Sequence, residues 1–133
     1  MIAPARLAEI YASLPTVPCK RLCGRYCGPI IAYPSERLAM ERLSWPTPFS
    51  FDAIRGRCGY YDNRDGQRCD IHVARPLICR LFGAVLDPRM MCQFGCQPSR
   101  WLTNEDVQRL IDELQESDGK PETALRPVTL AGL

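Results

Sequence analysis

The eight cysteines constrain this chain of 133 residues more than any other feature. Twelve prolines and nine glycines interrupt the sequence, so we expect a loop-rich middle that buries little apolar surface and needs cross-links. Cysteine thiolates around metal can supply those cross-links. The cysteines form an upstream triplet, a central group and a downstream pair, namely Cys19, Cys23, Cys27, Cys58, Cys69, Cys79, Cys92 and Cys96.

Disulfides are the alternative cross-link, and the redox compartment decides between the two chemistries. The N-terminal segment MIAPARLAEIYASL carries Arg6 and Glu9 and has no apolar signal-peptide core. No run of about 18 apolar residues occurs, so no membrane span is expected. We therefore expect a cytoplasmic protein, in which thiols stay reduced and clustered cysteines bind metal. A signal removed from a longer precursor would undercut this expectation.

The charge pattern gives little support to nucleic-acid binding. The formal net charge is +2, and the basic residues are spread along the chain instead of forming one basic face. Lys20, Arg21 and Arg25 lie between the first cysteines, where they can offset the charge of metal-bound thiolates. A protein partner is the expected kind of partner, and nucleic acid is not.

Hydrophobic periodicity predicts helices at both ends of the chain. Apolar residues at i, i+3, i+4 and i+7 predict a helix over residues 3–14 and a second over 104–116, which Thr103 and Asp106 begin with a capping box. Ser35 is the expected cap of a helix over about 36–44, and residues 30–33 fit a short strand. The residues expected to face inward are Leu7, Ile10, Tyr11, Leu14, Ala39, Met40, Leu43, Val107, Leu110, Ile111 and Leu114.

The stretch from Cys58 to Phe82 reads as a hairpin followed by a helix. Strand-forming tyrosines follow Cys58, and the turn signals DN and DG precede Cys69, so the two thiols are expected to lie close together. Pro76 suits the first turn of a helix to about residue 82 because it has no N–H to satisfy there. That helix carries Cys79.

These elements predict a small irregular α(+β) metal-stabilised domain, with short helices and one hairpin around cysteine-ligated metal centres. The domain is expected over residues 1–116, with its core motif at 19–96 and its C-terminal helix at 104–116. Residues 117–133 are expected to form an irregular tail, either disordered or strapped over the surface.

The cysteine spacing favours iron–sulfur chemistry without excluding zinc. Zinc sites often use pairs with two to four residues between the cysteines, and here the close pairs are C-x3-C. Three close cysteines with a remote fourth are a familiar ligand set for a [4Fe–4S] cluster. One or two centres are expected, with Zn²⁺ as the alternative. One division places Cys19, Cys23, Cys27 and Cys79 in one site and Cys58, Cys69, Cys92 and Cys96 in the other.

Three further residues near Cys79 bear on the predicted metal site. His72, the only histidine, is expected not to be a ligand, because eight cysteines already fill two sites. Arg75 and Arg80 are candidates for hydrogen bonds to ligand sulfurs or backbone carbonyls around the metal, with surface salt bridges as the alternative. A structural metal site contributes about 10–16 kcal/mol, so the metal-free protein is expected to fold poorly.

The run CDIHVARPLICRLF, with the upstream triplet, resembles the YkgJ-like cysteine-cluster family, a zinc- or iron-chelating domain. The resemblance covers roughly residues 19–96 and is most specific at Arg75-Pro76 and Cys79-Arg80. Two departures stand out: Gly28 follows Cys27 where the family usually has adjacent cysteines, and His72 replaces a usual aromatic residue. The resemblance implies an iron–sulfur or zinc protein. The family includes a flagellin lysine methylase, but this does not make the short chain a methylase.

Three functions remain open at this stage. The first is a small iron–sulfur protein for electron transfer, redox sensing or an accessory role. The second is a zinc-stapled structural or interaction module, and the third is a cluster-dependent methyl-transfer or radical enzyme component. A non-enzymatic role is favoured over an enzyme, since no catalytic triad, phosphate loop or dinucleotide fingerprint is present. No catalytic residue is assigned.

Overall fold

A computed structural model describes residues 1–18, 30–46, 48–52, 57–62, 68–69, 71–123 and 127–128. The upstream triplet Cys19, Cys23 and Cys27 and the expected hairpin turn at 63–66 lie outside these residues. The small α+β class is confirmed. The described helices are α1 (Pro4–Ala12), α2 (Pro34–Leu43), α3 (Leu77–Leu81) and α4 (Asn104–Asp118), with a 3-10 helix η2 (His72–Ala74). The strands are β1 (Ile31–Ala32), β2 (Phe51–Asp52), β3 (Arg57–Cys58), β4 (Tyr61–Asp62), β5 (Arg68–Cys69), β6 (Glu122–Thr123) and β7 (Pro127–Val128).

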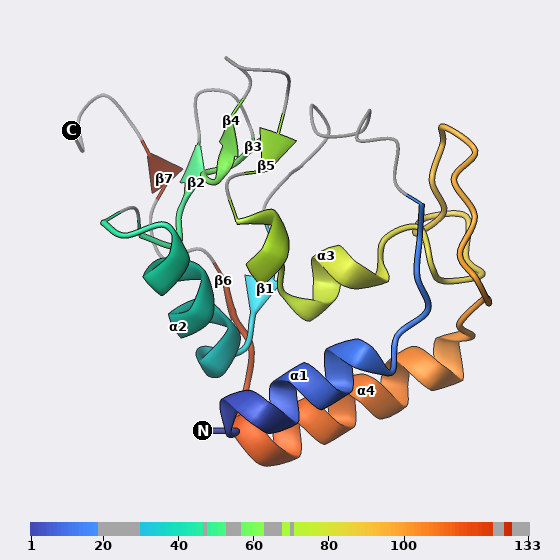
Figure 1. Ribbon diagram of the computed structural model, residues 1–133, viewed down its shortest axis with the longest axis horizontal. Coiled ribbons are helices and arrows are strands. Elements are labelled where there is room, and N and C mark those ends of the chain that lie inside the picture. The colour runs from blue at the N-terminus through green and yellow to red at the C-terminus, as the bar shows by residue number, and fades with distance from the viewer. Residues whose placement is uncertain are drawn as a thin grey trace.

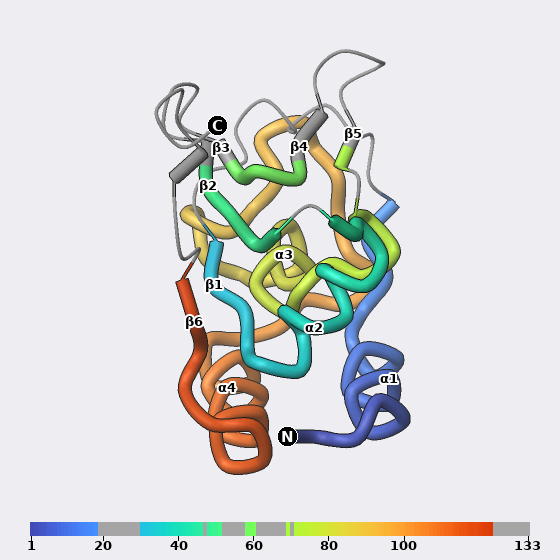
Figure 2. Tube along the Cα trace, turned by 90° about the vertical axis from the view of Figure 1, so that its left-hand side faces the viewer, coloured from blue at the N-terminus to red at the C-terminus, as the bar shows by residue number. Residues whose placement is uncertain are grey.

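Helices α1 and α4 lie side by side and antiparallel along one edge of the molecule, with α3 packed above them (Figures 1 and 2). The predicted terminal helices are thus confirmed. Their apolar stripes face one shared core, in which Leu7, Ile10 and Leu114 join Leu77 and Leu81 of α3. Leu114 is fully buried, as the periodicity of its helix predicts.

The capping box predicted for α4 is confirmed. Thr103 Oγ1 accepts a hydrogen bond from the Asp106 amide at 3.1 Å, and the Asp106 carboxylate accepts one from the Thr103 amide at 2.9 Å. The helix continues to Asp118, beyond the predicted end at residue 116. The Asp118 carboxylate accepts hydrogen bonds from the amides of Ile2 and Ser35. It thereby joins the N-terminus, α2 and the end of α4.

The predicted cap of α2 is wrong. The helix begins at Pro34, with Tyr33 as its N-cap residue and Glu36 at the third helical position. Pro34 suits the first helical position because it has no N–H. The helix therefore starts one residue before Ser35, which lies inside it and does not cap it. The Ser35 hydroxyl instead donates to Asp118 at 2.6 Å. Of the α2 residues predicted to face inward, Met40 is buried, whereas Leu43 is 50% exposed.

The described strands form three small sheets. Strands β2, β3, β4, β5 and β7 lie on the side of the molecule away from α1 and α4, whereas β1 and β6 lie between the two sides (Figure 1). One sheet has the order β3-β2-β7, and the other two pair β1 with β6 and β4 with β5. Strand β7 runs parallel to β2, and β6 runs antiparallel to β1. The segment expected as an irregular tail therefore contributes a strand to each of two sheets.

The described helices include none that is both long and apolar enough to cross a membrane.

Candidate metal centre

The predicted hairpin brings Cys58 and Cys69 together. Strands β4 and β5 pair antiparallel, with Tyr61 opposite Cys69. Cys58 ends β3, and two residues separate it from the start of β4. Cys69 packs against a small core cluster to which Cys58 belongs. The other buried members of this cluster are Ala32, Met40, Phe49, Tyr60 and Ile71. Ile71 follows β5 and packs in this cluster.

The environment of Cys58 keeps its thiol protonated in the absence of a cation. Burial raises the pKa of Cys58 to about 11, and the nearby Cys69 also raises it, against a hydrogen bond from the Tyr60 amide that favours the thiolate. Only 7% of Cys58 is exposed. A buried thiolate needs a compensating positive charge. A metal ion bound here would supply that charge and displace the proton.

A tight contact at Gly59 shapes the turn after Cys58. The Gly59 amide donates to the Ser50 carbonyl at 3.0 Å. A Cβ atom at position 59 would lie 2.2 Å from Ser50 Oγ and 2.9 Å from Ser50 O, so a side chain fits there only if its neighbours shift. Because Gly59 has no side chain, its amide can bond to Ser50 and extend the β2–β3 pairing by one residue. The next amide, that of Tyr60, then donates to the sulfur of Cys58.

Cys92 has the same local arrangement on another loop. The Phe94 amide donates to Cys92 Sγ at 3.4 Å, and the Gly95 amide donates to the Cys92 carbonyl at 3.4 Å. Gly95 has a φ of 81°, a conformation that favours glycine. In both turns, therefore, the amide two residues after a cysteine donates to its sulfur. Such a bond stabilises the thiolate, which is the form that ligates metal.

The loop that carries Cys92 and Cys96 lies against the chain that leads into the upstream triplet. Thr16 and Ser99 exchange two hydrogen bonds, Ser99 N to Thr16 O at 2.8 Å and Thr16 N to Ser99 Oγ at 3.0 Å. After the triplet, Ile30 packs against the cluster that contains Cys58 and Cys69. The described chain therefore enters the triplet beside the downstream pair and leaves it beside the hairpin.

Cys79 lies half-buried on α3, between two arginines that bind backbone carbonyls. Arg75 Nε donates to the His72 carbonyl at 3.0 Å. Arg80 donates from Nε to the Arg75 carbonyl at 2.6 Å and from Nη2 to the Val73 carbonyl at 3.0 Å. Both guanidinium groups thus hold the short segment that leads into α3.

The described residues do not by themselves assemble either predicted four-cysteine site. Among them, no group of three or more His, Cys, Asp and Glu side chains is arranged to hold a metal ion. The hairpin unites Cys58 with Cys69, whereas the loop of Cys92 and Cys96 lies apart from it in Figure 1. The triplet needed to complete a site lies outside the described residues.

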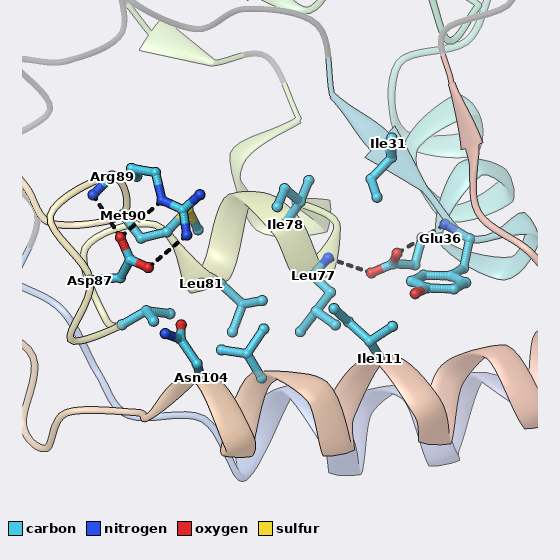
Figure 3. A pocket seen from close by; sticks show the side chains of 13 residues that line it. Ile31, Glu36, Leu77, Ile78, Leu81, Asp87, Arg89, Met90, Asn104 and Ile111 are labelled. Carbon is cyan, nitrogen blue, oxygen red and sulfur yellow. Dashed lines mark hydrogen bonds and ion pairs between the residues drawn. The ribbon is translucent and has the colours of Figure 1, made fainter.

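A cleft of about 350 Å³ lies between α3 and α4 (Figure 3). Its lining is mainly aliphatic, with the Asp87–Arg89 ion pair at one end and Glu36 at the other. None of the five described cysteines lines it. Glu36 is 1% exposed, and the sequence did not predict that it is buried. Its carboxylate accepts from the amide of the N-cap residue Tyr33, but a tyrosine is not a capping-box residue, so the sequence carries no sign of this bond or of the burial of Glu36.

Comparison with known proteins identifies a domain that spans the whole cysteine pattern. A family model described as "Putative zinc- or iron-chelating domain" matches residues 18–97. This range includes all eight cysteines and follows the resemblance seen in the sequence. No curated protein and no solved structure matches the chain significantly.

Proposed function

The chain belongs to the CxxCxxCC family of zinc- or iron-chelating domains, and from this premise we propose that it carries a cysteine-ligated iron–sulfur centre of the [4Fe–4S] type. As a member, the chain is a metal-binding cysteine-cluster protein. The proposed ligands are the eight cysteines, with Cys19, Cys23 and Cys27 supplying the closely spaced thiols. Thiolates are the donors that both zinc and iron–sulfur clusters select.

The observation that carries the metal-binding part of the proposal is the repeated amide-to-sulfur hydrogen bond at Cys58 and Cys92. The close spacing of Cys19, Cys23 and Cys27 is what favours a cluster over zinc. Neutral peptide donors offset thiolate charge without adding a competing ligand, and hydrogen bonds to sulfur tune the reduction potential of a cluster. When bound, the cluster would supply one-electron redox chemistry. The protein's own groups would bury it and set its potential, a role that suits electron transfer, redox sensing or an accessory function toward a protein partner in the cytoplasm.

A zinc-stapled structural module is the second candidate, and the burial of Cys58 favours it. Cys58 is 7% exposed, in a core cluster of six buried residues among those that the structure describes. A metal at this position would replace missing apolar contacts and hold the hairpin against the rest of the fold. The same amide-to-sulfur bonds would serve zinc as well as iron.

Anaerobic purification followed by metal and sulfide analysis separates the two candidates. An iron–sulfur protein is brown, absorbs broadly in the visible range, and contains iron and acid-labile sulfide. A colourless protein with stoichiometric zinc after metal-neutral purification would refute the cluster and support the zinc module.

Serine substitutions test the ligand assignment. Cys23→Ser, Cys58→Ser, Cys79→Ser and Cys92→Ser should each lower metal content. Ser50→Ala is the matched control, because Ser50 directly precedes Phe51, the partner of Cys58, and accepts the Gly59 amide, but offers no thiol. Metal content unchanged in all four cysteine variants would reject the assignment.

A further inference from the structure

Glu36 holds a buried carboxylate at the junction of three elements. It lies in the first turn of α2 and accepts hydrogen bonds from the Tyr11 hydroxyl of α1, the Tyr33 amide at 3.1 Å and the Leu77 amide of α3 at 2.5 Å. Figure 3 shows its carboxylate directed at the Leu77 nitrogen. Burial raises the pKa of Glu36, and the three donors and Arg80 oppose that shift. The buried carboxylate of Glu36 therefore has three hydrogen-bond donors.

The bond to Leu77 matters because α3 is only five residues long. A helix this short has little intrinsic stability, and its first N–H groups have no partner within the helix. Glu36 satisfies the first of them. Cys79 follows two residues later, so the direction in which α3 leaves Pro76 determines where the Cys79 thiol lies.

Arg80 completes the network on the other side of Cys79. Its guanidinium lies 3.9 Å from the centre of the Tyr11 ring, while Nε and Nη2 bind the carbonyls of Arg75 and Val73. Tyr11 is therefore hydrogen-bonded to Glu36 and stacked on Arg80 at the same time. Tyr11 of α1 thus joins Glu36 of α2 to Arg80 of α3.

We propose that Glu36 is the positioning residue for the Cys79 thiol, acting through the Leu77 amide and the Tyr11–Arg80 stack. The inference rests on the proposed metal-binding function and deepens it, because it assigns one ligand's placement to a residue outside the cysteine set. Supporting residues around metal ligands typically change metal affinity 10–100-fold when removed.

Asp118 provides a matched control for a purely structural role. It is also a buried carboxylate with three donors, namely Ile2 N at 2.9 Å, Ser35 N at 2.8 Å and Ser35 Oγ at 2.6 Å. Its bonds join the N-terminus, α2 and α4, and none of these donors belongs to α3. Asp118→Asn should therefore lower stability as Glu36→Gln does, without displacing Cys79.

The test measures metal release from Zn²⁺-loaded protein to a chromogenic chelator in the wild type, Glu36→Gln and Asp118→Asn. We expect release about ten-fold faster in Glu36→Gln and within about two-fold of wild type in Asp118→Asn. Co²⁺-loaded protein gives a second readout, since Glu36→Gln should weaken the thiolate-to-cobalt absorption and Asp118→Asn should not. If Glu36→Gln does not fold, Tyr11→Phe, which keeps the Leu77 bond, replaces it with a smaller expected increase.

A double-mutant cycle shows whether Glu36 acts through Cys79. In a Cys79→Ser background, Glu36→Gln should change the release rate by less than two-fold, because the thiol it positions is gone. Equal effects of Glu36→Gln in both backgrounds, or equal release from Glu36→Gln and Asp118→Asn, would overturn the inference while leaving the metal site intact. A wild-type protein that holds neither zinc nor iron would instead refute the proposed function.

Discussion

Replacing Gly59 by alanine places a methyl group where the β2–β3 pairing has no room for it. The new Cβ would lie 2.2 Å from Ser50 Oγ, 2.9 Å from Ser50 O and 3.1 Å from Ser50 C. The hydroxyl can rotate away, but the carbonyl is held by the 3.0 Å hydrogen bond from the Gly59 amide. The two strands must therefore separate by a few tenths of an ångström.

The magnitude follows from this combination of a movable and a fixed contact. Overpacking in a well-packed region costs about 1–3 kcal/mol, and the fixed carbonyl contact puts Gly59→Ala near 2 kcal/mol. For a chain of this length that corresponds to a fall in the melting temperature of about 6–10 °C. The shift also moves the Tyr60 amide that donates to Cys58, so metal release from the variant should be faster. Thermal unfolding of metal-loaded protein measures the first effect and chelator competition the second.

The companion change Ser50→Ala separates the two contacts. Ser50 Oγ is buried, and the described residues offer it no hydrogen-bond partner, so its removal alone should be neutral or stabilising by up to about 1 kcal/mol. In the double variant the 2.2 Å contact is gone and the 2.9 Å contact stays, so part of the loss should be recovered. Substitutions without a steric conflict usually change the free energy of unfolding by less than about 0.5 kcal/mol. A Gly59→Ala variant whose free energy of unfolding lies within that range of the wild type would refute the steric argument.

Three further perturbations test electrostatics and packing elsewhere. Because Cys58 has a pKa of about 11, a metal ion that binds its sulfur displaces one proton, so the apparent metal affinity should rise at least ten-fold per pH unit between about pH 6 and 8. Chelator competition measures this affinity, and an affinity that does not change with pH would exclude Cys58 as a ligand. Burial acts to raise the pKa of Asp118, but hydrogen bonds from Ser35 and Ile2 lower this pKa below its usual 3.8, so the stabilisation from Asp118 is complete above that pH and is lost as the pH falls through the lowered pKa. In Asp118→Asn the melting temperature should fall less steeply with pH below about pH 3.8, and a fall as steep as in the wild type would contradict this. Leu114→Ala, at a fully buried site, should cost about 2–5 kcal/mol in urea unfolding, whereas Leu86→Ala, at a site 59% exposed, should stay within about 0.5 kcal/mol; similar losses in both would disprove the assigned core.

The helices were predictable because their signals are local. The α1 and α4 stripes repeat over several turns, and Thr103 with Asp106 marks the start of α4 in the sequence itself. The hairpin was predictable for the same reason, since its turn signals lie between the two cysteines it joins. Local patterns of this kind need no knowledge of what packs against them.

The α2 errors show where local reasoning stops. Ser35 has the chemistry of a cap, yet Asp118, 83 residues away, takes both its amide and its hydroxyl. Leu43 fits the apolar stripe of the helix but falls beyond the end of its packed face. Glu36 looks like a surface residue until Tyr11 and Leu77, from two other helices, supply its partners. Each error involves contacts between distant parts of the chain.

The tail strands were hidden for a related reason. Strands β6 and β7 are two residues each and pair with β1 and β2, which lie about 90 and 75 residues earlier in the sequence. Two residues are too few to show any alternation of apolar and polar side chains. The partner strand, not the sequence of the tail, defines such an element.

The division of the core into two clusters changes what metal removal should do. The ten buried residues of the α1–α3–α4 cluster are apolar side chains and include no cysteine, whereas Cys58 is one of six in the hairpin cluster, with Cys69 against it. Because a structural metal site contributes about 10–16 kcal/mol, the sequence predicts that the metal-free protein folds poorly. The helical cluster can bury its apolar surface without any thiol. The hairpin cluster must either keep protonated thiols in its core or open to solvent. Dependence on metal should therefore concentrate in the hairpin half. The short helix α3 couples the two halves, because Leu77 and Leu81 pack in the helical cluster while α3 also contacts β1, whose Ala32 belongs to the hairpin cluster.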